Sequence, residues 1–91
     1  MFSVLFHSDI KKDLKKIDKK DIGEIIESMD YKLGSKPEFF GRPLRGTLKG
    51  YWKLRLGKYR AVYKITEKEV IVLAVLKRSE VYQHFLRLNR E

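Results

Sequence analysis

The stretch "YWKLRLGKYRAVYK", residues 51 to 64, alternates apolar and charged side chains on both sides of a Gly-Lys pair. Side chains two residues apart lie on the same face of a strand, so Lys53 and Arg55 share one face while their apolar neighbours share the other. A two-residue connection with glycine first suits a type II′ turn. Residues 48–56 and 59–66 are therefore predicted to form a β-hairpin.

The segment before the hairpin predicts one strand and two helices. Residues 2–7, "FSVLFH", are short, apolar and β-prone, as in a first strand. Apolar residues recur at helical spacing over residues 9–17 and again over 21–33, where Asp21-x-x-Glu24 has the form of a capping box. These two amphipathic helices are predicted to form an antiparallel hairpin.

The remaining segments complete the element order. Residues 35–47 hold both prolines and two glycines, which predicts a long irregular loop. Residues 70–76, "VIVLAVL", are apolar throughout, as in a central strand that is buried on both faces. Ser79 is placed to cap a last helix that runs to about Arg90. The predicted order is β-α-α-β-β-β-α.

This order predicts an α+β fold within a single domain that covers residues 1–91. The N-terminal helical hairpin packs on a mainly antiparallel four-stranded sheet, the last three strands form a meander, and a C-terminal helix follows. All helices are predicted to pack on one face of the sheet. A chain of 91 residues is long enough for one modest core and too short for two.

The composition indicates an anionic partner. Lys and Arg number 21 against 12 Asp and Glu, which gives a net charge of +9 with neutral His. Binding an anion relieves the resulting self-repulsion, and nucleic acid is the commonest such partner. No membrane partner is predicted, because a basic membrane-binding helix usually has a large apolar face. The sequence has no cysteine, no apolar run of roughly 20 residues and no signal-type N-terminus. These observations predict a soluble, cytoplasmic protein.

Positive charge is concentrated around the hairpin, and no Asp or Glu occurs between Glu38 and Glu67. Like charges on one face of a sheet destabilise it unless something anionic lies between them. The cations of this stretch are Arg42, Arg45, Lys49, Lys53, Arg55, Lys58, Arg60 and Lys64. A solvated basic face explains any one of them, whereas the whole set predicts an anion-binding surface.

An RNA phosphodiester fits such a surface. Its cleavage needs a base for the 2′-OH, an acid for the leaving 5′-oxygen and positive charge around the phosphorane between them. Only His7 and His84 offer an imidazole, and no Asp/Glu/His cluster has the spacing of a metal site, so no metal or other cofactor is predicted. Cations can replace histidine, because positive neighbours lower the pKa of a lysine and Arg binds phosphate through its planar fork.

Four motifs in and after the hairpin form a set. They are Leu44-Arg45-Gly46, Trp52-Lys53-Leu54-Arg55, Gly57-Lys58-Tyr59-Arg60-Ala61-Val62-Tyr63 and Arg78-Ser79-Glu80-Val81-Tyr82. Together they resemble the motifs of the RelE/ParE superfamily of type II toxins from bacteria and archaea. A leading strand and a helical hairpin also belong to that family, so the resemblance covers nearly the whole chain. The motifs are specific as a set, although each alone is weak.

The resemblance implies a ribosome-dependent endoribonuclease, since the RelE branch cleaves mRNA in the ribosomal decoding site with a basic surface rather than a pair of histidines. Lys53 and Arg55 match the two cations of the catalytic strand. Arg55 matches the family's proposed general base, which is often Lys there. Because Arg hardly deprotonates, Lys53 or a reorganised 2′-OH is the alternative. Arg60 matches the arginine that stabilises the phosphorane.

The resemblance also assigns residues near the C-terminus. Arg78 lies near the family's leaving-group arginine, with Lys77 as the competing position. Tyr82 matches the tyrosine that stacks on or orients the substrate, although its spacing alone suits a core residue. Trp52 and Tyr63 are predicted to be core residues. The residues predicted to contact RNA are Arg42, Arg45, Lys49, Lys77 and His84.

The partners implied by the resemblance are a cognate antitoxin, the ribosome and its mRNA. An acidic or amphipathic antitoxin segment, disordered until it wraps the toxin, would neutralise the basic surface. Two other functions stay open. The ParE branch has the same fold but targets DNA gyrase, and a catalytically degenerate toxin would only dock an antitoxin or RNA. The set of cations favours the nuclease.

Overall fold

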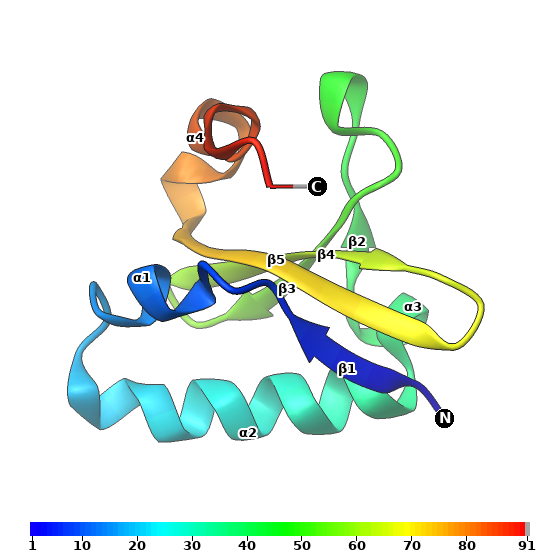
Figure 1. Ribbon diagram of the computed structural model, residues 1–91, viewed down its shortest axis with the longest axis horizontal. Helices are drawn as coiled ribbons and strands as arrows, with labels where there is room; N and C mark the ends of the chain where they lie inside the picture. Colours follow the sequence, from blue (N-terminus) through cyan, green and yellow to red (C-terminus); the bar gives the residue numbers. More distant parts are fainter. Residues whose placement is uncertain (91) are drawn as a thin grey trace.

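The computed structural model describes residues 1–90 and has an α+β architecture, as predicted (Figure 1). Its elements are β1 (Ser3–Phe6), α1 (Ile10–Leu14), α2 (Lys19–Ser35), α3 (Pro37–Phe40), β2 (Arg42–Pro43), the 3-10 turn η1 (Gly46–Leu48), β3 (Trp52–Leu56), β4 (Tyr59–Ile65), β5 (Glu69–Lys77), the 3-10 turn η2 (Arg78–Glu80) and α4 (Val81–Leu88). None of the helices in this described part is long and apolar enough to cross a membrane.

The sheet has five strands in the order β1-β5-β4-β3-β2, with β1 parallel to β5 and the other pairs antiparallel. The predicted four strands and their meander are present. The fifth strand, β2, lies in the segment predicted to be irregular and pairs Arg42 with Lys53 and Pro43 with Trp52. Proline tolerates this position because β2 is an edge strand, where a missing N–H costs no internal hydrogen bond.

The predicted hairpin is confirmed. Leu56 pairs with Tyr59 across the two-residue turn, and Gly57 has a φ of +64°, which only glycine adopts without strain. The first strand of the hairpin begins at Trp52 rather than at residue 48, because Leu48 belongs to η1 and is fully buried.

The helices pack on both faces of the sheet, so the prediction that all share one face was wrong for α4. Helices α1, α2 and α3 cover one face, and α4 covers the other together with η1 (Figure 1). Each face of the sheet has its own core: the first lies under α1, α2 and α3, and the second lies under α4 and η1. On β4, Tyr63 points into the first core, whereas Val62 contributes to the second with Val81 and Phe85 of α4. The central strands are apolar on both sides, and the second side therefore needs its own helix.

Helix boundaries also differ from the prediction. Helix α2 begins two residues earlier than predicted, at Lys19, and Asp18 at its N-cap makes no side-chain capping bond. The helix continues through Gly34 to Ser35. The predicted capping box is therefore absent, and Asp21 and Glu24 lie along the helix with their carboxylates available for other contacts.

Gly41 between α3 and β2 provides a stability prediction. A Cβ at this position would collide with the hydroxyl of Tyr63 and lie 3.0 Å from the carbonyl oxygen of Pro37, to which that hydroxyl donates a 2.7 Å hydrogen bond. We expect Gly41→Ala to lower the free energy of unfolding by about 3 kcal/mol, from overpacking and the broken buried hydrogen bond. Urea denaturation measures this change. Gly23→Ala on α2 is the control, since no heavy atom beyond its chain neighbours and its own helix backbone lies within 4 Å of the added methyl group. A comparable loss there would contradict the explanation.

Candidate functional site

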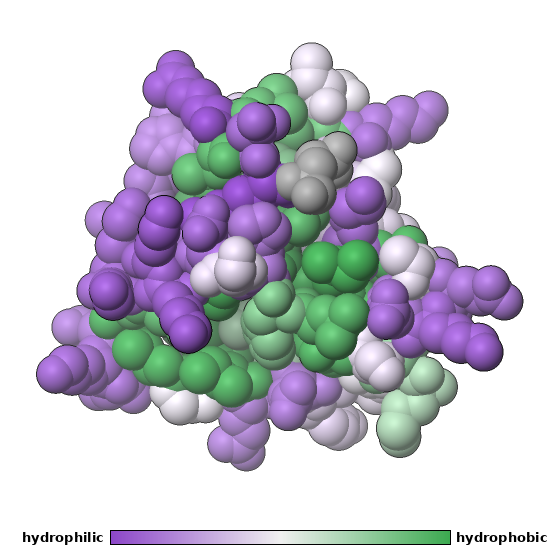
Figure 2. Space-filling view, viewed as in Figure 1, coloured by the Kyte–Doolittle hydropathy of each residue, from purple (hydrophilic) through white to green (hydrophobic). Residues whose placement is uncertain are grey.

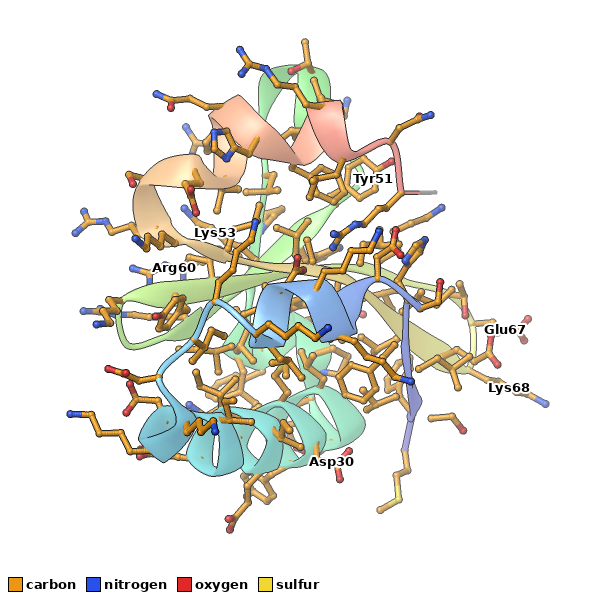
Figure 3. The ribbon with its side chains drawn as sticks, turned by 60° about the vertical axis from the view of Figure 1, so that its left-hand side comes forward. Asp30, Tyr51, Lys53, Arg60, Glu67 and Lys68 are labelled. Carbon is orange, nitrogen blue, oxygen red and sulfur yellow. The ribbon has the colours of Figure 1, made fainter. Side chains whose placement is uncertain are left out.

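Four cations share one face of the sheet. In the β2–β3–β4 ladder, Arg42 lies opposite Lys53, and Arg55 lies opposite Arg60. Leu54, between the two β3 cations, points into the first core, so Lys53 and Arg55 point to the face that α4 covers. Figure 3 shows Lys53 and Arg60 at the same end of the sheet. In each of these two pairs, like charges thus face each other across neighbouring strands, and this arrangement costs stability.

These cations line a cleft of about 360 Å³ between the sheet and the start of α4. Its lining residues are Phe40, Arg42, Lys53, Arg55, Arg60, Arg78, Val81 and Tyr82. Five of them are cationic, and no carboxylate among residues 1–90 lines the cleft. We call this cavity the basic cleft. Its composition suits an anionic ligand that also carries apolar or aromatic groups beside its negative charge.

Arg60 is the most constrained of the five cations. It is only 9% exposed, and its Nη1 donates 2.7 Å hydrogen bonds to the carbonyl oxygens of Gly57 and Tyr59. Burial, followed by the positive charges of Arg55 and Arg78, lowers the pKa of the Arg60 guanidinium. Its Nε and Nη2 make no hydrogen bond to the rest of residues 1–90. The two carbonyls therefore fix the orientation of a fork whose other side can bind an anion.

Two aromatic side chains contribute to the basic cleft. Tyr82 is 52% exposed, and its hydroxyl accepts a 3.4 Å hydrogen bond from the backbone N–H of Arg45. It therefore lies at the rim of the cleft and is not the core residue that its spacing alone suggested. Phe40 was not identified from the sequence, although the two adjacent aromatic residues of "EFF" in α3 offered a signal. Tyr63, in contrast, is fully buried, as predicted.

The remaining predicted RNA contacts lie around the cleft rather than in it. Arg78 lines both the basic cleft and a separate hollow, whereas its competitor Lys77 lines the hollow, with Lys58 and Ser79, but not the basic cleft. Arg45 and Lys49 are exposed on either side of η1. His84 Nδ1 lies 3.4 Å from a carboxylate oxygen of Glu80. None of Arg45, Lys49, Lys77 and His84 lines the basic cleft.

Two other polar features lie outside the basic cleft. His7 accepts a 3.0 Å hydrogen bond at Nδ1 from the backbone N–H of Asp9, which fixes the start of α1. The lysines around residues 11–20 are exposed and belong to the hydrophilic surface on the left of Figure 2. Within residues 1–90, no group of three or more His, Cys, Asp or Glu side chains is arranged to hold a metal ion.

Comparison with known proteins identifies the family. The family described as "ParE toxin of type II toxin-antitoxin system, parDE" matches residues 4–82. The chain is 30% identical to toxin RelG of Mycobacterium tuberculosis over 84 residues, which are 90% of this chain and 97% of RelG. It is 29% identical to toxin RelE of the same organism over 84 residues, 90% of this chain and 87% of RelE.

Solved structures give the same result. The toxin–antitoxin complex RelBE2 of M. tuberculosis matches with a TM-score of 0.78 and 30% identity, covering 85% of this chain and 98% of the matched one. The RelB–RelE complex of Methanococcus jannaschii matches with a TM-score of 0.64 and 25% identity over 89% and 98% of the two chains. The fold is thus that of a small α+β toxin. The chain belongs to the RelE/ParE family and is a toxin of a type II toxin–antitoxin system.

Proposed function

We propose that this toxin inhibits translation by cleaving mRNA on the ribosome, without a metal cofactor. The observation that supports this proposal is the basic cleft, in which five cations and two aromatic rings converge without a carboxylate among the described lining residues. Single-stranded RNA offers both matching features, because its phosphates carry charge and its unpaired bases stack on aromatic side chains. Action on the ribosome places the toxin in the cytoplasm.

Cleavage proceeds by attack of the 2′-oxygen on the adjacent phosphorus. The new bond to the 2′-oxygen forms as the bond to the 5′-oxygen breaks, so the products carry a 2′,3′-cyclic phosphate and a 5′-OH. Negative charge develops on the non-bridging oxygens in the phosphorane, where preorganised donors stabilise it most. Arg60 supplies these donors, because its Nη1 is already anchored to two carbonyls and its other nitrogens are free of hydrogen bonds within residues 1–90.

The other cleft residues have complementary roles. Lys53 is the one lysine among the lining cations and is the base that accepts the 2′-OH proton, since arginine hardly deprotonates. Arg55 adds positive charge beside the phosphorane. Arg78, the first residue of η2, stabilises the leaving 5′-oxygen, which takes up a proton from water. Tyr82 stacks on or orients a base from the rim.

The test is to incubate the purified toxin with translating ribosomes and map the mRNA ends. We expect cleavage within the message and 5′-OH ends, which a kinase labels without prior phosphatase treatment. Cleavage should persist once a chelator has removed every divalent ion beyond the ribosome's own requirement. Ends that carry a 5′-phosphate would contradict the mechanism. Intact translation with altered DNA supercoiling would instead support a gyrase inhibitor, and RNA binding without cleavage a degenerate toxin.

We also propose that a cognate antitoxin covers the basic cleft. The RelBE2 and RelB–RelE structures are toxin–antitoxin complexes, and acidic side chains of such a partner would neutralise Arg42, Arg55 and Arg60. Apolar anchors should hold most of the affinity. Leu5 and Phe6 are suitable anchor sites, because they are 44% and 42% exposed on the edge strand β1, where Figure 2 shows an apolar surface.

A further inference from the structure

A second cleft, of about 390 Å³, lies between α2 and the β3–β4 hairpin. Its lining residues are Asp21, Glu24, Ile25, Ser28, Lys32, Arg55, Leu56, Gly57, Lys58 and Tyr59. Ile25, Leu56 and Tyr59 belong to the first core, so this cleft opens on the α2 side of the sheet. The basic cleft opens on the α4 side, and Arg55 lines both.

The second cleft carries charges of both signs that do not pair with each other. Asp21 and Glu24 lie on α2, while Arg55 and Lys58 lie on the hairpin. No oppositely charged atoms of these four side chains approach within 4.0 Å among residues 1–90. Lys58 Nζ instead lies 5.7 Å from the centre of the Tyr59 ring. A ligand can therefore use both the acceptors on α2 and the donors on the hairpin.

An extended nucleic-acid strand can pass from one cleft to the other. Strand β2 pairs only with Trp52 and Lys53, which leaves the edge of β3 uncovered from Leu54 to Leu56. Arg55 lies on this open edge and is exposed. A nucleic-acid strand with one phosphate in the basic cleft could place the neighbouring nucleotide over this edge, still in contact with Arg55.

We infer that the second cleft binds a nucleotide adjacent to the cleaved phosphodiester and selects its base. Arg55 and Lys58 bind the phosphate, and the carboxylates of Asp21 and Glu24 accept hydrogen bonds from the exocyclic amino group of the base. Adenine, cytosine and guanine carry such a group, whereas uracil has carbonyl oxygens in its place and only a ring N–H as a donor. A good base contact of this kind discriminates by roughly tenfold or more. This inference rests on the proposed function and gives it a sequence preference.

The charges favour a nucleotide over a segment of the antitoxin. An acidic peptide suits the basic cleft. In the second cleft it could pair with Lys32, Arg55 and Lys58. It would, however, leave Asp21 and Glu24 without hydrogen-bond donors. A nucleotide matches both halves, because its phosphate is anionic while the amino group of its base is a hydrogen-bond donor.

Binding can be measured without cleavage. Isotope-labelled toxin is titrated with trinucleotides that carry deoxyribose throughout and differ only in one terminal base, and the backbone amides of Ser28 and Gly57 are followed by NMR. We expect these amides to shift with adenine, cytosine or guanine, and with uracil only at about tenfold higher concentration. The double variant Asp21→Asn/Glu24→Gln should reduce this difference to about twofold. Asp30→Asn is the matched control, because Asp30 lies on the outer side of α2 and does not line the cleft (Figure 3).

The outcomes separate this inference from the proposed function. Unshifted amides with all four bases, equal binding of uracil, or an unchanged preference in the double variant would overturn the inference even if the toxin cleaves mRNA. Shifts with the expected preference but no cleavage on the ribosome would overturn the proposed function and retain the nucleotide site. With both intact, mapped cleavage sites should disfavour uridine at one flanking position by about tenfold, and the double variant should lose this bias.

Discussion

Replacing Arg60 by methionine is expected to lower the rate of mRNA cleavage on the ribosome by about a thousandfold. The Arg60 fork is oriented by the carbonyls of Gly57 and Tyr59 before any substrate binds, so the substitution removes a donor that needs no rearrangement in the transition state. Arg60→Lys should recover only part of the rate, because a lysine keeps the charge and loses the fork. Single-turnover cleavage of a defined message measures both effects.

The same substitution should not destabilise the toxin. Burial and the charges of Arg55 and Arg78 lower the pKa of Arg60 in the folded state. A cation whose pKa is lowered by folding binds its proton more tightly when unfolded, so its charge opposes folding at every pH below the folded pKa. Only at strongly alkaline pH, where Arg60 loses its proton in the folded state, is this opposition relieved and the free energy of unfolding raised. At neutral pH, relief of that charge should offset the two hydrogen bonds that Arg60→Met removes from the carbonyls of Gly57 and Tyr59, so the variant should unfold at about the same urea concentration as the parent.

Lys68→Met is the matched control for the loss of one positive charge. Lys68 is exposed on the turn between β4 and β5, at the opposite end of the sheet from Arg60 (Figure 3). We expect its cleavage rate to stay within about twofold of the parent, since no phosphate contact is lost. An equal loss of activity in both variants would show that net charge rather than the Arg60 fork drives the rate.

Replacing Asp13 by alanine is expected to lower the free energy of unfolding by about 3 to 5 kcal/mol. Asp13 and Arg90 are 4% and 6% exposed, and they form two hydrogen bonds of 2.7 and 3.1 Å. Asp13 also accepts a 2.9 Å hydrogen bond from the backbone N–H of Val75. The substitution therefore leaves a buried guanidinium without its main partner and an edge N–H of β5 without an acceptor.

A double variant tests this explanation. Asp13→Ala combined with Arg90→Met removes both charges, and apolar replacement of a whole buried pair costs far less than removal of one partner. Urea denaturation should thus show the double variant to be more stable than Asp13→Ala alone. If the two losses simply add, the buried charge is not the cause.

The hairpin and the position of its cations could be predicted from the sequence because both depend on local rules. Alternation over residues 51–56 determines which side chains share a face, and the Gly57-Lys58 turn sets the register that brings Arg55 opposite Arg60. The same rules predict Lys53 beside them. The catalytic roles of these residues stay proposals.

Features that depend on distant contacts could not be predicted in this way. Strand β2 is only two residues long, too short for any periodicity. The side of the sheet chosen by α4 depends on which face of β5 stays uncovered after α1 and α2 pack, a question that local periodicity does not answer. Asp13 shares a helix with Ile10 and Leu14, and nothing nearby indicates a partner 77 residues away.

The ion pair between Asp13 and Arg90 has a consequence for the time at which a newly made toxin can complete its fold. A ribosome that adds about 5 to 20 residues per second needs roughly 4 to 15 seconds to travel from one partner to the other. During that interval the first helix has a carboxylate with no counterion, and Tyr82 on the last helix has not yet reached the rim of the cleft. The basic cleft, whose rim includes Tyr82, is therefore complete only after the chain has been made as far as its last helix, several seconds after α1.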